Sequence, residues 1–208
     1  MAGMMRIKGF FSKLFGKKRS RVGIYGPPNA GKTTLANRIV RDVTGEAIGP
    51  VREVPHETRR ARRKEGVEIN SGGNKLLIDI VDTPGVTTKI DYHEFLEYGM
   101  DQDEAVARAR EATEGVAEAM HWLREDIDGV IYVLDSTQDP FMHVNIMMVG
   151  ITESRKLPVI IVATKIDLPD AAPQRIKSAF PQHPVVMVSG LEGNNMDDLY
   201  AKIAEVFR

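Results

Sequence analysis

The chain has 208 residues, of which 42% are hydrophobic and 27% charged, and its formal net charge is −1. This is the composition of a soluble globular protein and excludes a disordered chain. The absence of cysteine excludes disulfides, thiolate metal sites and a cysteine nucleophile, and it favours a reducing, cytoplasmic setting. No apolar run reaches the roughly 20 residues that a membrane-spanning helix needs.

The charge is divided between a basic leader and an acidic body. Residues 1–21 hold seven basic residues and no acidic one, so the remainder carries a net charge of −8. Apolar residues recur at helical spacing within the leader: Met4, Ile7, Phe10, Phe11, Leu14 and Phe15. An aromatic-rich apolar face with basic neighbours is typical of a helix that lies on a membrane surface. We therefore expect an amphipathic helix in residues 1–20 and contact between residues 4–21 and an anionic membrane.

Two alternatives remain open for the leader. Its helix can dock on the protein's own core or on a second subunit, or the segment can be a basic tail without fixed structure.

After the leader, short β-branched runs alternate with longer helical patterns. The expected strands are 21–25, 65–70, 75–81, 130–135, 158–163 and 184–188. The expected helices are 31–42, 103–124, 141–155, 172–179 and 194–207. This alternation predicts one α/β domain over residues 21–208, with a mostly parallel sheet whose ligands bind beyond the carboxyl ends of its strands.

Residues 26–33 read GPPNAGKT and stand between a predicted strand and a predicted helix. They match G-x-x-x-x-G-K-[ST], a loop whose backbone N–H groups surround the phosphates of a nucleotide. We expect Lys32 to bridge the terminal phosphates and the Thr33 hydroxyl to ligate Mg²⁺. The predicted nucleotide-binding positions of this loop are Pro27, Asn29, Ala30, Gly31, Lys32, Thr33 and Thr34.

A basic run lies upstream of the second strand and consists of Arg59, Arg60, Arg62, Arg63 and Lys64. It has three interpretations: it contacts phosphate on a partner, it supplies an arginine across a dimer, or it is a solvated edge strand. Positive charge on an edge strand opposes pairing with a further strand.

Asp82-Thr83-Pro84-Gly85 follows the strand at 75–81. The Asp82 carboxylate at the strand end can hold Mg²⁺ through water, and the Gly85 N–H can contact a terminal phosphate.

Residues 87–125 form an additional helical segment downstream of this motif. Its apolar stripe predicts an amphipathic helix that packs mostly on the sheet and consists of Val106, Ala109, Ala112, Val116, Met120 and Leu123. Tyr92, Phe95 and Tyr98 are predicted to form a contact surface that responds to the nucleotide.

Two further motifs follow predicted strands and indicate which base is bound. In Thr164-Lys165-Ile166-Asp167, the Asp167 carboxylate can accept both N1–H and N2–H of guanine, a pair that adenine lacks. Lys165 can lie over the base plane, and Ser189, Gly190 and Leu191 can close the pocket on its other side. The order of the motifs thus predicts GTP.

Residues 21–207 resemble the Era/TrmE group of translation-factor-like P-loop GTPases. The segments that carry this resemblance are GPPNAGKT, PHETRR (55–60), DTPG, TKID and SGLEGNNMDDL. The resemblance implies a six-stranded sheet flanked by helices on both faces and a cycle of GTP binding and hydrolysis. It also matches Thr58 to the switch I threonine that ligates Mg²⁺ when GTP is bound. The expected catalytic residues are Lys32, Thr58 and Gly85, and the expected Mg²⁺ ligands are Thr33, Thr58 and Asp82.

The chain departs from the group's pattern at two base-reading positions. Thr164 stands where the group usually has asparagine, and Gly190 stands where it usually has alanine, whose backbone N–H reads the guanine O6. The printed chain ends at Arg208, so we expect a stand-alone G domain without the KH domain that follows in Era.

Hydrolysis is expected to be slow, because Val86 follows Gly85 at the position where Ras-like proteins carry a glutamine that orients the attacking water. Asn29 matches the residue that binds K⁺ in some relatives, so the resemblance implies stimulation by K⁺. His56 can in principle contact the water, although a mobile surface histidine is the alternative.

The sequence therefore predicts a Mg²⁺-dependent, K⁺-stimulated GTPase that acts as a molecular switch, peripheral on the cytoplasmic face of a membrane. Aromatic residues in the leader favour membrane over nucleic acid, because binding phosphate needs only charge. The alternatives are a ribosome- or RNA-associated GTPase factor and a GTP-binding module with negligible turnover. A nucleotide-dependent dimer of G domains is also expected, while the protein effector is not predicted.

Overall fold

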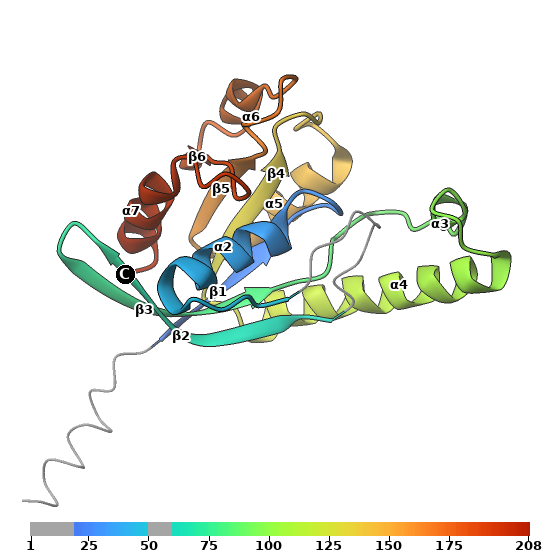
Figure 1. Ribbon diagram of the computed structural model, residues 1–208, viewed down its shortest axis with the longest axis horizontal. Coiled ribbons are helices and arrows are strands. Elements are labelled where there is room, and N and C mark those ends of the chain that lie inside the picture. The colour runs from blue at the N-terminus through green and yellow to red at the C-terminus, as the bar shows by residue number, and fades with distance from the viewer. Residues whose placement is uncertain (1–18, 50–59) are drawn as a thin grey trace, which may run out of the picture.

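A computed structural model describes residues 19–49 and 60–208, which form a six-stranded sheet with helices on both faces (Figure 1). The predicted leader helix lies outside the described residues. The strands are β1 (Ser20–Tyr25), β2 (Arg62–Ser71), β3 (Asn74–Asp82), β4 (Gly129–Asp135), β5 (Val159–Thr164) and β6 (Val185–Met187). The helices are α2 (Lys32–Thr44), α3 (His93–Leu96), α4 (Gln102–Glu125), α5 (His143–Ser154), α6 (Pro173–Ala179) and α7 (Met196–Val206).

The strand order is β2-β3-β1-β4-β5-β6, and every neighbouring pair is parallel except the β2–β3 hairpin. The predicted mostly parallel sheet is thus confirmed. The strand expected at 65–70 is longer than predicted, because Arg62, Arg63 and Lys64 also pair with β3. The register shifts between Lys64 and Val67, where Gly66 has a φ of 68°, and this bulge interrupts the alternation that would have revealed the strand's start.

Alternate residues of the inner strands enter two separate cores, one on each face of the sheet. In β4, Ile131 and Val133 pack under α2 and α7, whereas Tyr132 and Leu134 face the other way and pack with residues of α4, α5 and α6. Strands buried on both faces need apolar residues at consecutive positions, which is the pattern that the sequence carries.

Five loops meet at one edge of the sheet, because the parallel strands β1, β3, β4, β5 and β6 end there. Ile24 near the end of β1 is level with Asp82, the last residue of β3, and Asp135 at the end of β4 is level with Thr164 at the end of β5. Residues that lie far apart in the sequence are thereby brought to the same edge, which we call the nucleotide edge after the ligand that the sequence predicts.

Helix α4 extends well beyond the sheet, and α3 lies beside its projecting end (Figure 1). The helix begins at a capping box, in which the Asp101 carboxylate accepts from the Glu104 N–H while the Glu104 side chain accepts from the Asp101 N–H. We call residues 87–112, with α3 and the first half of α4, the overhang. No helix of the described residues is both long and apolar enough to cross a membrane.

The buried face of α4 differs from the prediction in the residues that form it and in the part of the protein that it contacts. Val106, Ala109, Val116 and Met120 are only half-buried, and the fully buried positions are Ala105, Arg108, Ala112, Gly115, Ala119 and Leu123. Ala119 and Leu123 belong to the core beneath the sheet, and Val116 and Met120 pack against it. The expected packing on the sheet therefore holds for Val116, Met120 and Leu123 but not for Ala109 and Ala112, because the first half of α4 lies outside the area of the sheet.

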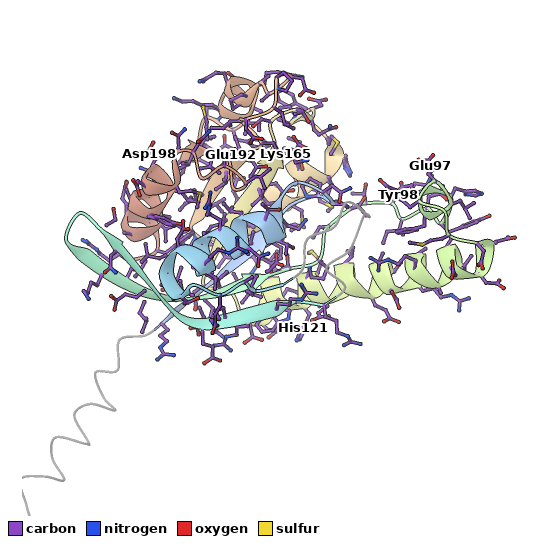
Figure 2. The ribbon with its side chains drawn as sticks, in the orientation of Figure 1. Glu97, Tyr98, His121, Lys165, Glu192 and Asp198 are labelled. Carbon is purple, nitrogen blue, oxygen red and sulfur yellow. The ribbon has the colours of Figure 1, made fainter. Side chains whose placement is uncertain are left out.

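Phe95 of α3 fills the space that the sheet does not reach. It is fully buried against Ala105 and Ala112, and the Arg108 guanidinium lies 5.8 Å from its ring centroid. The prediction that Phe95 belongs to a contact surface is wrong, since the ring is the centre of a small core. Tyr98 is 47% exposed, and Figure 2 shows it with Glu97 at the far end of the overhang.

Candidate functional site

The phosphate loop, residues 26–31, joins β1 to α2 in a conformation that few residues adopt. Gly26 and Gly31 have φ values of 149° and 89°, and Asn29 has a φ of 57°. A Cβ on Gly26 would lie 2.2 Å from the Val133 carbonyl oxygen, so only glycine fits there. No side chain caps the N-terminus of α2, which leaves its first N–H groups available to an anion.

Lys32, the first residue of α2, is folded back onto this loop. Its ammonium donates to the Pro27 carbonyl oxygen at 2.6 Å, and the side chain is buried. Burial lowers the pKa of Lys32 to about 8, although the nearby Asp82 carboxylate acts in the opposite direction. The cation is therefore held inside the loop by one neutral acceptor, where an anionic ligand would stabilise its charge.

Thr33 and Asp82 are joined across the nucleotide edge. The Thr33 hydroxyl donates to Asp82 Oδ2 at 2.8 Å. The other carboxylate oxygen of Asp82 is buried without a hydrogen-bond partner among the residues that the structure describes. Burial raises the pKa of Asp82 to about 6, against the opposing effects of Thr33, Lys32 and Arg62. A hydroxyl and a carboxylate with an unsatisfied oxygen are hard oxygen ligands of the type that Mg²⁺ takes.

The segment after Asp82 is fastened to the phosphate loop by its backbone. The Val86 N–H donates to the Gly26 carbonyl at 3.1 Å, and the Thr83 hydroxyl donates to the Ile24 carbonyl at 2.7 Å. A Cβ on Gly85 would lie 2.9 Å from Pro28 Cα, so a glycine is needed for this close approach. Thr58, the third expected Mg²⁺ ligand, and His56 lie outside the described residues.

Thr164 connects the loop that is predicted to read the base with the phosphate loop. Its hydroxyl lies 2.7 Å from the Ala30 carbonyl oxygen and 3.1 Å from that of Leu134, and it donates best to the nearer one. An asparagine amide at this position would offer the same kind of donor. Threonine thus supplies the connection, which explains in physical terms how the departure from asparagine is tolerated.

The other residues of this loop are more exposed. Lys165 has a φ of 59°, and its ammonium lies 2.6 Å from Asp135 Oδ2. Asp167 is exposed two residues further on. Asp135 was not among the predicted site residues. The signal available in the sequence was its position at the end of β4, which is parallel to the strand that precedes Lys165.

Ser189 is fully buried and organises the loop that follows β6. Its hydroxyl accepts from the Glu192 N–H at 3.0 Å and its carbonyl accepts from the Gly193 N–H at 2.8 Å. Gly190 lies against the start of α2, and Leu191 is 72% exposed. The structure thus brings Ser189 and Gly190 close to the helix that begins with Lys32.

A cavity of about 380 Å³ lies beside the phosphate loop. Its wall includes Pro28, Asn29, Asp135 and Lys165, and the Asn29 side chain is exposed. The cavity therefore gives solvent access to one side of the loop.

Two residues of the basic run at 59–64 form ion pairs with neighbouring carboxylates. Arg63 pairs with Asp79 at 2.6 Å, and Lys64 pairs with Glu46 at 2.5 Å, on the strand at the edge of the sheet. Among the three interpretations of this run, these contacts favour the solvated edge strand for Arg63 and Lys64. Arg59 lies outside the described residues.

Comparison with known proteins gives the same assignment of the domain. Residues 21–165, more than half of the chain, match the model of a family described as 50S ribosome-binding GTPase. The chain is 32% identical over 187 residues to the tRNA modification GTPase MnmE of Syntrophotalea carbinolica, which covers 90% of this chain and 34% of that protein. It is 30% identical over 183 residues to GTPase Era of Geobacter metallireducens, which covers 86% of this chain and 52% of that protein.

The solved structures agree on the fold. Aquifex aeolicus Era bound to GDP.AlF4− has a TM-score of 0.68 and 23% identity, and the match covers 91% of this chain and 57% of that one. An Era in complex with MgGDPNP and nucleotides of 16S ribosomal RNA has a TM-score of 0.67 and 24% identity, with the same coverage. The chain spans between about a third and about a half of the length of the curated relatives it matches.

The predicted P-loop GTPase fold and the resemblance to the Era/TrmE group are thereby confirmed. The chain belongs to the family of 50S ribosome-binding GTPases.

Proposed function

We propose that this protein binds GTP with Mg²⁺ and hydrolyses it as a molecular switch. The observation that carries the proposal is the pair of Thr33 and Asp82, in which one buried carboxylate oxygen has no partner in the described part of the chain. With Thr58, these residues would hold Mg²⁺, which when bound neutralises negative charge on the phosphates.

The chain's own groups would position the phosphates. Lys32 would exchange its bond to the Pro27 carbonyl for a phosphate oxygen, and the uncapped start of α2 would face the same anion. The Gly85 N–H would contact the terminal phosphate from the other side. These fixed donors would stabilise charge that develops as the phosphoryl group is transferred.

Slow intrinsic turnover follows from the environment of Val86. The side chain is 1% exposed and packs in the core beneath the sheet, so it neither reaches nor orients an attacking water. A partner that supplies a polar group would therefore accelerate the reaction.

The base would be read by the loops that begin at Thr164 and Ser189. Asp167 would accept N1–H and N2–H of guanine, Lys165 would lie along the base, and Gly190 and Leu191 would close the other side. The Thr164 bond to Ala30 supports this role, because it holds the base-reading loop at a fixed distance from the phosphate loop.

A single-turnover assay with GTP and with ATP, in Mg²⁺ and in EDTA, tests this proposal. Thr33→Ala should lower the GTP hydrolysis rate by about 30-fold or more, because it removes a metal ligand. Thr44→Ala, at the exposed end of the same helix, is the matched control and should leave the rate unchanged. Equal hydrolysis in EDTA, or wild-type turnover by Thr33→Ala, would refute the Mg²⁺ site.

Asn29 is proposed as a K⁺ ligand. Its left-handed backbone lies at the surface of the phosphate loop, and a carboxamide oxygen is a suitable ligand for K⁺. Hydrolysis should be faster in K⁺ than in Na⁺ at equal ionic strength, and Asn29→Ala should remove the difference. Equal wild-type rates in the two salts would exclude this role.

For the cellular partner, we propose a ribosomal or other structured RNA. The support is that the matched family is described as ribosome-binding, that one relative is named a tRNA modification GTPase, and that one Era was solved with 16S ribosomal RNA. The membrane contact predicted for residues 4–21 falls almost wholly outside the described residues and stays a sequence-based prediction.

Co-sedimentation with ribosomes and with anionic vesicles, with and without residues 1–20, distinguishes these partners. Binding to ribosomes that depends on GTP supports the RNA proposal. Binding to vesicles alone that is lost with residues 1–20 would replace it with the membrane role.

A further inference from the structure

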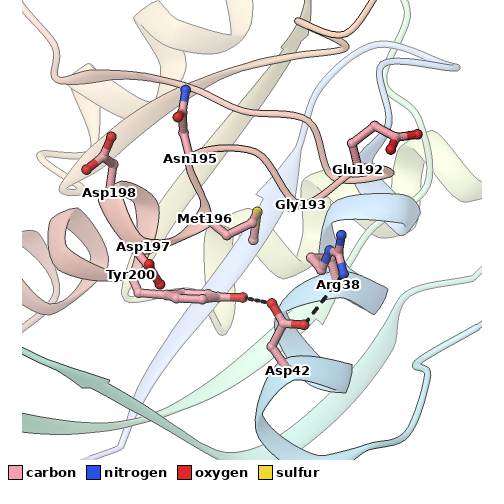
Figure 3. Close-up of a pocket in the computed structure, with 9 residues that line it drawn as sticks. All are labelled: Arg38, Asp42, Glu192, Gly193, Asn195, Met196, Asp197, Asp198 and Tyr200. Carbon is pink, nitrogen blue, oxygen red and sulfur yellow. Dashed lines mark hydrogen bonds and ion pairs between the residues drawn. The ribbon is translucent and has the colours of Figure 1, made fainter.

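A groove between α2 and the start of α7 contains an arginine that contacts the loop at residues 189–193. This loop includes Gly190 and Leu191, which are proposed to close the base pocket. Figure 3 shows Arg38 of α2 beside Asp42, with Tyr200 of α7 on the other side of that carboxylate. The Arg38 guanidinium also donates to two backbone carbonyls, through Nε to Gly190 at 3.2 Å and through Nη2 to Leu191 at 3.1 Å.

These contacts fix the peptide planes around Gly190. The Ser189 carbonyl, in the plane before Gly190, accepts from the Gly193 N–H at 2.8 Å, and the Gly190 carbonyl, in the plane after it, accepts from Arg38. Since a peptide unit is planar and trans, holding a carbonyl also sets the direction of the N–H in the same unit. Arg38 thereby sets the Leu191 N–H, and the two bonds together restrict the backbone on both sides of Gly190.

The restriction matters because residue 190 is a glycine. Glycine has more accessible backbone conformations than alanine, so an unrestrained loop would present its N–H groups less reproducibly. No backbone strain requires glycine here: a Cβ on Gly190 would make ordinary contacts of 3.5 Å with Leu35 and 3.6 Å with Thr34.

The loop is shaped to admit the guanidinium. Gly193 has a φ of 85°, and a Cβ there would lie 2.3 Å from Arg38 Nη2. Asp42 lies 3.8 Å from Arg38 Nη1 and accepts a 2.5 Å hydrogen bond from the Tyr200 hydroxyl, so the carboxylate is held beside the arginine by α7. Arg38 itself is therefore oriented from two helices.

Arg38 also connects the two halves of the nucleotide site. It lies on the helix that begins with Lys32, so the phosphate-binding end of α2 and the loop at 189–191 share one support. We propose that Arg38 is a positioning residue for guanine recognition, which holds the backbone N–H groups of the Gly190 loop where they meet the O6 of the base. This inference rests on the proposed role of that loop in base reading.

The test compares nucleotides that differ at the base edge. The diphosphates of guanosine and inosine both carry O6, whereas 2-aminopurine riboside diphosphate does not. Arg38→Ala should weaken GDP and inosine diphosphate by the same factor, roughly fivefold, because one well-placed hydrogen bond is at stake. It should leave the affinity for the 2-aminopurine nucleotide unchanged, measured by competition against a fluorescent GDP.

Two control variants separate this effect from general damage to the groove. Arg41→Ala removes an exposed arginine from the same helix, and Asp198→Ala removes an exposed carboxylate from the same groove. Both should bind all three nucleotides like the wild type. Gly190→Ala in the Arg38→Ala background should recover part of the lost GDP affinity, since alanine restricts the loop that arginine no longer holds.

The outcomes are distinguishable. Equal weakening of all three nucleotides would show that Arg38 is only structural support, and an unchanged GDP affinity would show that it is dispensable; either result overturns the proposal. If the wild-type protein bound GDP and the 2-aminopurine nucleotide with equal affinity, the loop would not recognise O6. Arg38 would then have no role in that recognition. Failure to prefer GDP over ADP would instead count against Asp167 and the proposed base specificity.

Discussion

The nucleotide edge and the overhang are stabilised by different kinds of contact. At the nucleotide edge, single hydrogen bonds connect segments that are distant in sequence, as Thr164 does to Ala30 and Thr33 does to Asp82. In the overhang, a buried phenylalanine packs on two alanines of α4, and apolar residues of the preceding segment surround them. The edge therefore depends on the identity of individual polar residues, whereas the overhang depends mainly on apolar volume.

The largest expected effect comes from removing the charge of Asp82. Asp82→Asn should reduce GTP hydrolysis at least about 100-fold, because an amide is a much weaker metal ligand than a carboxylate. Single-turnover hydrolysis measures this, with the exposed Asp170→Asn as control. A rate within a few-fold of wild type would show that the edge does not depend on this residue.

The same substitution should stabilise the nucleotide-free protein at neutral pH. The pKa of Asp82 is raised in the folded state from 3.8 to about 6, so folding favours the protonated acid. The stability that this group contributes is complete below about pH 4 and is lost as pH rises through about 6. Asp82→Asn should therefore be more stable than wild type at pH 7.5, on the order of 2 kcal/mol, and similar to it near pH 4. Thermal unfolding without nucleotide at both pH values measures this, and a less stable variant at pH 7.5 would contradict it.

In the overhang, Phe95→Ala should destabilise the packing of α3 on α4 by about 3 kcal/mol, the usual consequence of deleting a buried ring. Faster hydrogen exchange across residues 93–112 would report it. Leu96→Ala, at the 37% exposed neighbour, is the control and should have little effect. GDP affinity should stay within about twofold of wild type; a large loss of affinity would show that the two regions are not independent.

This contrast explains what the sequence could predict. Lys32, Thr33, Asp82 and Thr164 were identifiable because their chemistry requires particular residue types at the ends of particular strands. The same reasoning gave the sheet and its mostly parallel order. The helix at 102–125 was also predictable from its periodicity, but periodicity does not name the surface on which a helix packs. The partner of Ala112 was thus assigned to the sheet, whereas it is Phe95.

Arg38 and Asp135 were missed for a related reason. Neither belongs to a motif, and each acts through a contact that only the folded chain creates: Arg38 with the carbonyls of residues 190 and 191, and Asp135 with Lys165. An arginine on a helix surface and an aspartate at a strand end have many ordinary roles, so their types alone were not informative.

A smaller effect is expected at Thr164. Thr164→Val keeps the side chain's shape but removes the hydroxyl that donates to Ala30, and we expect GDP to bind about tenfold more weakly. Thr164→Asn should bind nearly as well as wild type, since an amide offers the same donor. Calorimetric titration measures both, with the exposed Thr113→Val on α4 as the control. Valine and asparagine variants with the same affinity would refute the proposed connection.

The smallest effect concerns a hydrogen bond between α4 and Ala61, the residue before β2. Glu118 accepts from the Ala61 N–H at 3.0 Å, and Glu118→Ala should destabilise the protein by about 1 kcal/mol. Chemical denaturation measures this change against Glu114→Ala, an exposed residue one turn earlier on the same helix. Equal stability of the two variants would mean that this hydrogen bond contributes nothing.

The central claim is that the nucleotide edge selects the guanine base and binds the phosphates together with Mg²⁺. Its most direct test is calorimetric titration of the wild-type protein with GDP and with ADP in Mg²⁺ at pH 7.5. The Asp167 carboxylate would find no paired donors on adenine, so ADP should bind about 1,000-fold more weakly than GDP. Equal affinities for GDP and ADP would contradict the account.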